Sequence, residues 1–215
     1  MVDLPQGFVL TRHWRDTPTG TQVEFWLATD SGPRRIRLPH QPSVAFIPAS
    51  QREQAEALLH DEKNVELREL ALRDFEHRPV LGLYCSQHGQ LMRLETALRR
   101  AGVEVYEADV RPPERYMMER FITAPVRFGG TPDAEGLLFD AQMKPDPHYR
   151  PSLKLASLDI ETTAQGELYS IALEGCGERQ VYMLGPPNGD DSEVDFQLEY
   201  CDSRTLLLKK LNDWF

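Results

Sequence analysis

Leu153-Lys-Leu-Ala-Ser-Leu-Asp-Ile-Glu-Thr162 is an apolar run that ends in two carboxylates, and it indicates the fold of the last third of this chain. In a β-strand, residues two apart point to the same face, so Asp159 and Glu161 share one face and Leu158 and Ile160 share the other. Two acids on the inner side of a buried strand are costly unless something neutralises them. Hard oxygen ligands suit Mg²⁺ or Mn²⁺. The stretch therefore predicts a strand that carries a metal site.

The residues that follow predict more of the same sheet. Two further strands are expected at 166–173 and 179–185, then an acidic loop at 190–195 and a helix capped by Ser203. Three meandering strands with paired acids on the first, then a helix, are how a ribonuclease-H-like nuclease core begins. The bare Asp-x-Glu pattern is also frequent by chance in an acidic protein. Two solvated carboxylates in a non-catalytic binding or docking module are therefore the alternative.

The first 148 residues predict an α+β domain of two parts. Aromatic and β-branched runs broken by Gly, Pro and Asp turns predict a β-meander over 7–38. The order β-α-β-β-α-β follows, which is the split βαβ arrangement of ferredoxin-like and RNA-recognition folds. Its strands are expected at 43–47, 65–70, 80–85 and 103–106, and its helices at 51–60 and 87–101. A helix over 113–122 and a short β region to about Met143 complete the domain.

A polar, proline-rich stretch, Lys144-Pro-Asp-Pro-His-Tyr-Arg-Pro151, separates these two patterns. Such segments are typical of domain boundaries. We expect an amino-terminal domain over 1–148 and the incomplete start of a nuclease domain over 149–215.

Composition restricts the class of protein. Apolar residues make up 40% of the chain and charged residues 27%, as in soluble globular proteins. No run approaches the roughly 20 apolar residues of a membrane helix, and the start lacks a signal peptide. The three cysteines, Cys85, Cys176 and Cys201, are far apart in the sequence and predict reduced thiols. We expect a cytoplasmic, nucleoid-associated protein that does not contact a membrane.

Charge gives a mixed indication about nucleic acid. The net charge of −10 argues against a nucleic-acid surface, although residues 151–215 hold most of the excess, with 5 Lys/Arg against 12 Asp/Glu. Arg111, Arg115 and Arg120 form a local cluster that could meet phosphates, and arginines on a solvated face are the commoner explanation. Phe46 and Tyr84 are expected on the central strands of the split βαβ sheet, where RNA-recognition domains stack bases. We favour core packing for both rings and keep stacking as the alternative.

Several segments resemble a known family. Ser157-Leu-Asp-Ile-Glu-Thr162 matches the first exonuclease motif of proofreading DNA polymerases. The segments Asp109-Val-Arg-Pro-Pro-Glu-Arg-Tyr116 and Val181-Tyr-Met-Leu-Gly-Pro186 are similar to bacterial family B DNA polymerases. The resemblance runs from about Gly7 to Phe215.

The resemblance implies a DNA-directed DNA polymerase with a 3′→5′ proofreading exonuclease, acting in DNA replication and repair. It implies that Asp159 bridges two Mg²⁺ or Mn²⁺ ions and that Glu161 binds one and orients the attacking water. Primer-template DNA and deoxynucleotides are the implied partners, with a sliding clamp contacted through regions outside this sequence.

The later exonuclease motifs, the palm, the fingers and the thumb are absent, so we expect this chain alone to be inactive. We expect it to self-associate through an uncovered sheet edge. A stand-alone 3′→5′ exonuclease is the rival reading, disfavoured because its further aspartates are missing.

Overall fold

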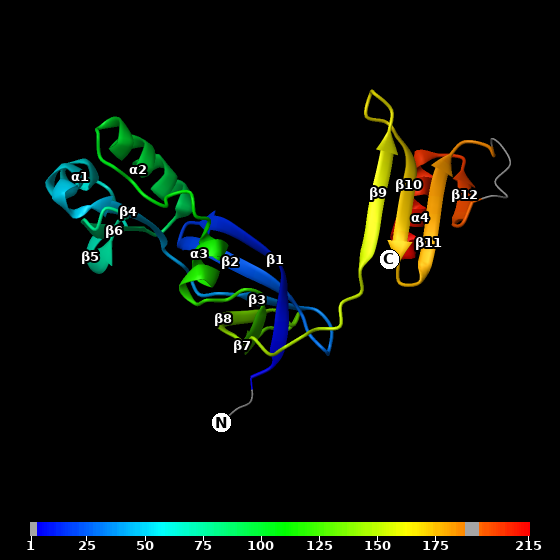
Figure 1. Ribbon diagram of the computed structural model, residues 1–215, viewed down its shortest axis with the longest axis horizontal. Coiled ribbons are helices and arrows are strands. Elements are labelled where there is room, and N and C mark those ends of the chain that lie inside the picture. Colours follow the sequence, from blue (N-terminus) through cyan, green and yellow to red (C-terminus); the bar gives the residue numbers. More distant parts are fainter. Residues whose placement is uncertain (1–3, 188–193) are drawn as a thin grey trace. The chain divides into compact units, whose positions relative to one another are not determined.

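The computed structural model describes residues 4–187 and 194–215, so most of the expected acidic loop at 190–195 lies outside the described residues. The chain divides into two compact units, Met1–Pro151 and Ser152–Phe215 (Figure 1). Both mix helices with a larger share of strand, as an α+β fold does. No helix in the described ranges is long and apolar enough to cross a membrane.

The first part of unit 1 is a closed five-stranded barrel. Its strands pair in the order β1-β2-β3-β8-β7, with bounds β1 Gln6–Thr17, β2 Gly20–Ala28, β3 Arg34–Arg37, β7 Pro125–Pro132 and β8 Leu138–Pro145. The first three run antiparallel in meander order. The expected meander forms, but two later strands close it into a barrel: β8 pairs in parallel with β3, and β7 pairs with β1. Phe25, Ile36 and Phe128 fill the barrel interior.

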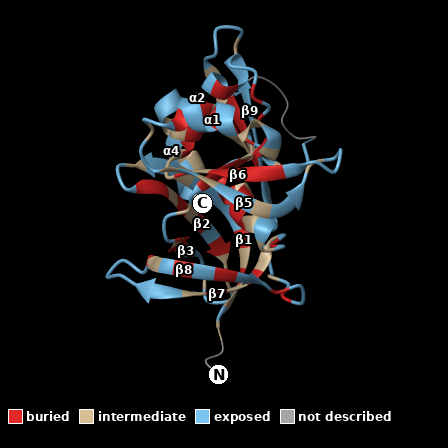
Figure 2. Ribbon diagram, turned by 90° about the vertical axis from the view of Figure 1, so that its left-hand side faces the viewer, coloured by how far each residue is buried: buried red, intermediate tan, exposed pale blue. Residues whose placement is uncertain are grey.

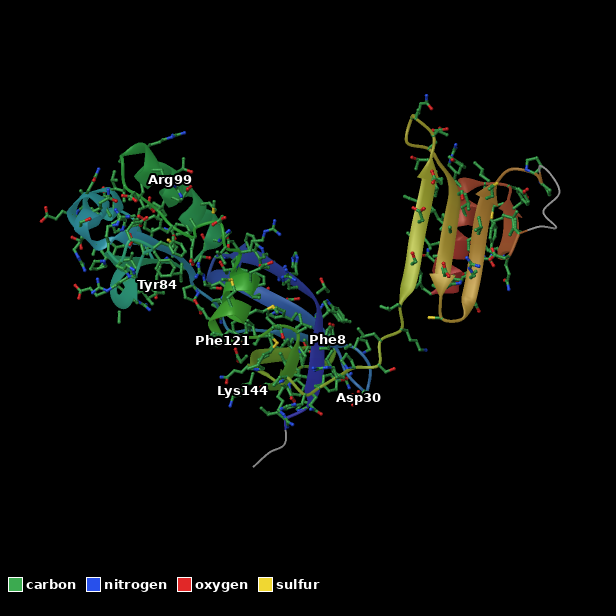
Figure 3. The ribbon with its side chains drawn as sticks, viewed as in Figure 1. Phe8, Asp30, Tyr84, Arg99, Phe121 and Lys144 are labelled. Atoms are coloured by element: carbon green, nitrogen blue, oxygen red, sulfur yellow. The ribbon has the colours of Figure 1, made fainter. Side chains whose placement is uncertain are left out.

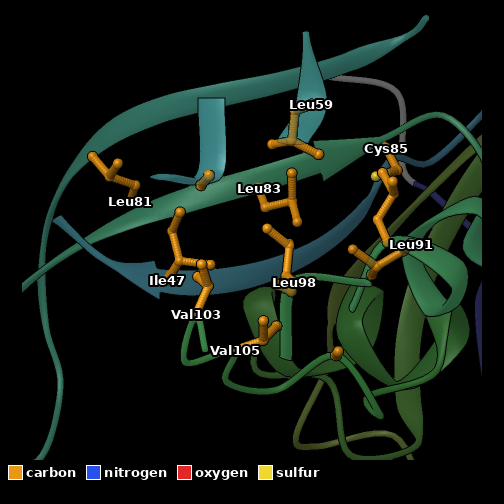
Figure 4. Packing of buried hydrophobic residues seen from close by; sticks show 13 residues of the cluster. Ile47, Leu59, Leu81, Leu83, Cys85, Leu91, Leu98, Val103 and Val105 are labelled. Carbon is orange, nitrogen blue, oxygen red and sulfur yellow. The ribbon is translucent and has the colours of Figure 1, made fainter. Parts of the chain in front are cut away.

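The second part of unit 1 is a three-stranded sheet with helices on one face. The strands, in the order β4-β6-β5, are β4 Ser43–Pro48, β6 Pro79–Cys85 and β5 Val65–Arg73. The 3₁₀ turn η1 (Ala49–Gln51), α1 (Arg52–Leu59) and α2 (His88–Arg100) supply the other layer. Ile47, Leu83, Leu91 and Leu98 pack between the layers (Figure 4). The central strand β6 is mostly buried and β5 mostly exposed (Figure 2).

The fourth strand expected in this sheet, at 103–106, does not form. Tyr106 makes a single antiparallel bridge with Phe46, through N–H···O bonds of 3.0 and 2.8 Å. Glu107 has a φ of 56°, in the left-handed region, which turns the backbone away from the extended path directly after the bridge. The sheet therefore has three strands and one bridge.

Helix α3 (Pro112–Glu119) packs against β1 and β2 of the barrel. Its first two residues are prolines, whose missing N–H groups cost little in a first turn. It ends three residues before the predicted limit, and the hydroxyl of Tyr116 accepts a hydrogen bond from the Met143 N–H.

In its described residues, unit 2 is a four-stranded sheet covered by one helix. The order is β12-β11-β10-β9, with bounds β9 Ala156–Thr162, β10 Leu168–Gly175, β11 Glu178–Leu184 and β12 Gln197–Cys201. Strand β12, which runs parallel to β11, was not predicted. Helix α4 (Arg204–Trp214) is capped by Ser203, whose Oγ accepts from the Leu206 N–H at 3.2 Å. Leu207 of this helix is fully buried in the core of the unit.

Candidate functional site

Asp159 and Glu161 project from one face of β9. In the antiparallel register Asp159 lies opposite Ala172 and Glu161 opposite Ser170, whereas Leu158 and Ile160 lie opposite Leu173 and Ile171. Residues directly opposite each other share a face. The two apolar partners on β10 pack in the core with Leu207, so the acids lie on the face away from α4. The alternation in the sequence predicts this arrangement.

The burial expected for this strand is wrong. Every residue of β9 is exposed, including Leu158 at 46% and Ile160 at 51%. The reason is its position, because among the described residues β9 is at the end of the sheet and pairs with β10 alone. Water therefore solvates both carboxylates, and the argument that a buried acid pair requires a cation does not apply.

The donor set at this face is small. Asp159 Oδ1 accepts a hydrogen bond from the Ile160 N–H at 3.0 Å. Within the described ranges, no three His, Cys, Asp or Glu side chains gather closely enough to hold a metal ion. Two carboxylates on one strand face still have the right chemistry for Mg²⁺ or Mn²⁺, which prefer oxygen ligands. The pair fits as part of a metal site.

A shallow hollow of about 300 Å³ includes Asp159 in its lining, together with Ala172, Glu174 and Arg179. The Arg179 guanidinium is bound by two carboxylates, Glu174 at 3.4 Å and Asp195. This cation is therefore already neutralised beside the acid pair.

The three candidate arginines do not form one phosphate-binding surface. Arg115 is buried, donates to Glu107 Oε2 at 2.9 Å and lies 5.4 Å from the centre of the Phe46 ring. Arg120 lies 3.9 Å from the centre of the Tyr116 ring and donates to the carbonyl oxygen of that residue. Arg111 is exposed, directly before the first residue of α3. Arg115 and Arg120 thus make contacts within unit 1 that no local sequence pattern indicated.

Phe46 and Tyr84 are not core residues, so the packing role favoured for them is wrong. Both are half-buried and lie outside the core that the helices cover, because their strand neighbours Ala45 and Leu83 point to that side. Tyr84 is on the sheet face away from α2 (Figure 3). The Arg68 guanidinium lies 4.2 Å from the centre of its ring.

Both rings line a hollow of about 670 Å³, which we call the sheet groove. Its lining includes apolar side chains that sequence analysis did not select. Two of these side chains, Leu70 and Leu72, could have been recognised from their spacing, because residues two apart on a strand share a face. The lining also includes Phe75, Arg73, Arg78, Arg115, Tyr106 and five carboxylates, namely Asp74, Glu76, Glu104, Glu107 and Glu119.

Comparisons with known proteins show which polymerases this chain is similar to. Two family models match unit 1, "DNA polymerase II, N-terminal" over residues 7–42 and "DNA polymerase II, insertion domain" over residues 43–103. The chain is 61% identical over 209 residues to DNA polymerase II of Escherichia coli (strain K12), covering 97% of this chain and 27% of that protein.

The fold is similar to a family B DNA polymerase from the hyperthermophilic archaeon Pyrobaculum calidifontis. The TM-score is 0.65 at 17% identity, over 86% of this chain and 27% of that one. The chain thus spans little more than a quarter of either relative. Its sequence is similar to the amino-terminal part of DNA polymerase II, and its fold is similar to part of a family B DNA polymerase.

Proposed function

We propose that this chain is the amino-terminal part of a DNA-directed DNA polymerase with a 3′→5′ proofreading exonuclease. The observation that carries the proposal is the 61% identity to DNA polymerase II over 97% of the chain. Polymerisation, proofreading and a role in replication and repair in the cytoplasm are proposed for the whole protein, since the chain matches 27% of that relative. Its partners would be primer-template DNA, deoxynucleotides and a sliding clamp.

Asp159 and Glu161 are the proposed exonuclease acids. They share a strand face and are open to solvent, so they would hold Mg²⁺ or Mn²⁺ within reach of a DNA strand. When bound, such ions activate water and stabilise the leaving oxygen in phosphodiester hydrolysis. The two side chains supply oxygen ligands and hold them in a fixed spacing on β9.

This chain alone is proposed to be inactive. Two carboxylates leave most positions of an octahedral magnesium shell to water, so we expect an affinity on the order of millimolar or weaker. The test is hydrolysis of a single-stranded oligonucleotide with Mg²⁺ or Mn²⁺, beside Asp159→Ala and a matched exposed acid, Glu178→Ala. Metal-dependent hydrolysis that only Asp159→Ala abolishes would contradict the incomplete site. The whole protein should extend a primed template and remove a mismatched 3′ end.

DNA binding by the isolated chain is proposed to be weak. The net charge is −10, and Arg115 and Arg120 are held by contacts within unit 1. What binding there is should fall steeply with salt, because phosphate contacts release counterions. Anisotropy with labelled single-stranded DNA at increasing salt measures it. Tight binding at physiological salt that is lost in Phe46→Ala or Tyr84→Ala would show that the ring removed stacks on a base.

Self-association is proposed through the exposed edge of β9. Leu158 and Ile160 leave apolar surface beside an edge with unpaired backbone groups, which favours pairing with another strand. Light scattering after gel filtration should show a dimer that Ile160→Lys reduces to monomer. A monomer at all concentrations would exclude this interface.

A non-catalytic module is the second candidate, since both acids are solvated and no burial requires a metal ion. In that case Asp159→Ala in the whole protein would leave both the polymerase and the exonuclease activity unchanged.

A further inference from the structure

The sheet groove has an apolar side built around a rigid turn. Phe75 is fully exposed, and Leu72 is 51% exposed beside it. The turn that carries Phe75 is fixed by Asp74, whose Oδ1 accepts from the Glu76 and Arg78 N–H groups at 3.0 and 2.8 Å. The Arg78 side chain closes the same turn through Nε to Asp74 Oδ2, at 2.6 Å. A defined set of hydrogen bonds thus holds a large apolar ring in water.

The charges along the groove exclude an attraction for phosphate. Five carboxylates and three arginines line it, and each arginine already has an acceptor. Arg78 binds Asp74 and Glu104, and Arg115 binds Glu107. Arg73 donates to a backbone carbonyl oxygen at 2.7 Å. The rim therefore presents excess negative charge, which repels a nucleic-acid backbone and attracts cationic side chains.

We propose that the sheet groove is a docking site for a basic segment of a partner protein. An apolar side chain of that segment lies against Phe75 and Leu72, and its Lys or Arg residues meet the carboxylates of the rim. Exposed apolar surface rimmed by polar groups is typical of protein interaction sites. Complementary charge selects the partner and sets its register. The half-buried Phe46 and Tyr84 rings form the floor of this site.

The test uses the whole chain and a fluorescein-labelled peptide with a Leu-Phe pair between two lysines on each side. Its charge-reversed twin, with glutamates, and a twelve-residue oligothymidine are the competing probes. Fluorescence anisotropy should show binding of the basic peptide alone. Phe75→Ser and Leu72→Ser should each weaken it by about ten-fold or more, because each removes apolar contact area. Both residues are exposed, so circular dichroism should show an unchanged fold.

Matched controls separate the groove from general attraction to an acidic protein. Phe121 is 86% exposed in unit 1 and does not line the groove, so Phe121→Ser should leave the affinity unchanged. Glu76→Lys should weaken binding, and Glu135→Lys, at an exposed acid outside the groove, should weaken it less. The proposal is wrong if the basic peptide fails to bind, or if Phe75→Ser binds it as well as the wild-type chain does. It is also wrong if Glu76→Lys and Glu135→Lys lower the affinity for the peptide by the same factor. Preferential binding of the oligothymidine, lost in Tyr84→Ala, would assign the groove to nucleic acid instead.

Discussion

Helix α2 should lose much of its stability when one remote aspartate is removed. The residue before the helix, Gln87, makes no side-chain capping bond. Asp16 of β1 caps the helix instead: its Oδ2 accepts from the Gly89 N–H at 2.7 Å and its Oδ1 from the His88 N–H at 3.0 Å. The Thr21 hydroxyl donates to the same carboxylate at 2.7 Å. The barrel thus supplies the cap for a helix of the neighbouring sheet.

The magnitude follows from these contacts. Asp16→Ala leaves two first-turn N–H groups without this acceptor, and loss of an N-cap costs about 0.5–2 kcal/mol. Removing a negative charge near a helix N-terminus costs roughly a further 0.3–1 kcal/mol. We expect the free energy of unfolding to fall by about 1–3 kcal/mol in total. Asp16→Asn keeps one of the two acceptor oxygens and loses the charge, so it should cost less than Asp16→Ala.

The effect should depend on pH with a defined sign. Burial raises the pKa of Asp16, but hydrogen bonds from Thr21, Gly89 and His88 outweigh it and hold the pKa below 3.8. A carboxylate with a depressed folded-state pKa contributes stability above its unfolded pKa and loses it as the pH falls through the folded value. The difference between wild type and Asp16→Ala should therefore be constant near neutral pH and shrink below 3.8.

Urea unfolding followed by the fluorescence of Trp14, in a chain in which Trp26 and Trp214 are replaced by Phe, measures the effect locally. The Trp14 ring lies 4.8 Å from the His88 ring in an edge-on contact, so it reports the start of α2. Asp109→Ala, at an exposed loop position, is the control and should change little. Equal stability of Asp16→Ala and Asp109→Ala, with the same acid profile, would refute the capping role.

Three further predictions test other parts of the molecule. Limited proteolysis should cut within 144–152, where the two units meet in the sequence, and preferred cuts inside α1 or α2 would contradict two separate domains. Exposed Cys176 should react first with a thiol reagent, because Cys85 and Cys201 are buried and burial raises the pKa of Cys85 to about 12; simultaneous reaction of all three in the native protein would contradict this. Arg115→Met should lower the free energy of unfolding in urea by about 1–3 kcal/mol, because it removes a buried charged donor, and an equally small effect of Arg115→Met and exposed Arg111→Met would contradict it.

Local pattern was a good guide to local structure. The alternation around Asp159 places both acids on one strand face, and Ser203 caps α4 as its position suggested. Pairing between distant segments was not visible in the same way. Closure of the barrel depends on a parallel contact between Ile36 and Leu138, which no local periodicity specifies.

The expectations about the burial of β9 and of Phe46 were wrong for the same reason. Alternation says which residues share a face, but the neighbouring elements decide which face is covered. Among the described residues, strand β9 has a partner strand on one side only. The helices of unit 1 cover one face of β4, and Phe46 lies on the other face. The capping of α2 by Asp16 joins residues 72 positions apart and left no signal in the sequence.

Asp159 and Glu161 are proposed to serve a proofreading exonuclease, so removing one of them should separate that activity from polymerisation. The whole protein is compared with its Asp159→Ala variant for removal of a mismatched 3′ nucleotide and for primer extension, in the same reaction with Mg²⁺. The variant should lose removal of the mismatched nucleotide and keep primer extension. Removal of the mismatched nucleotide at the wild-type rate by Asp159→Ala would contradict it.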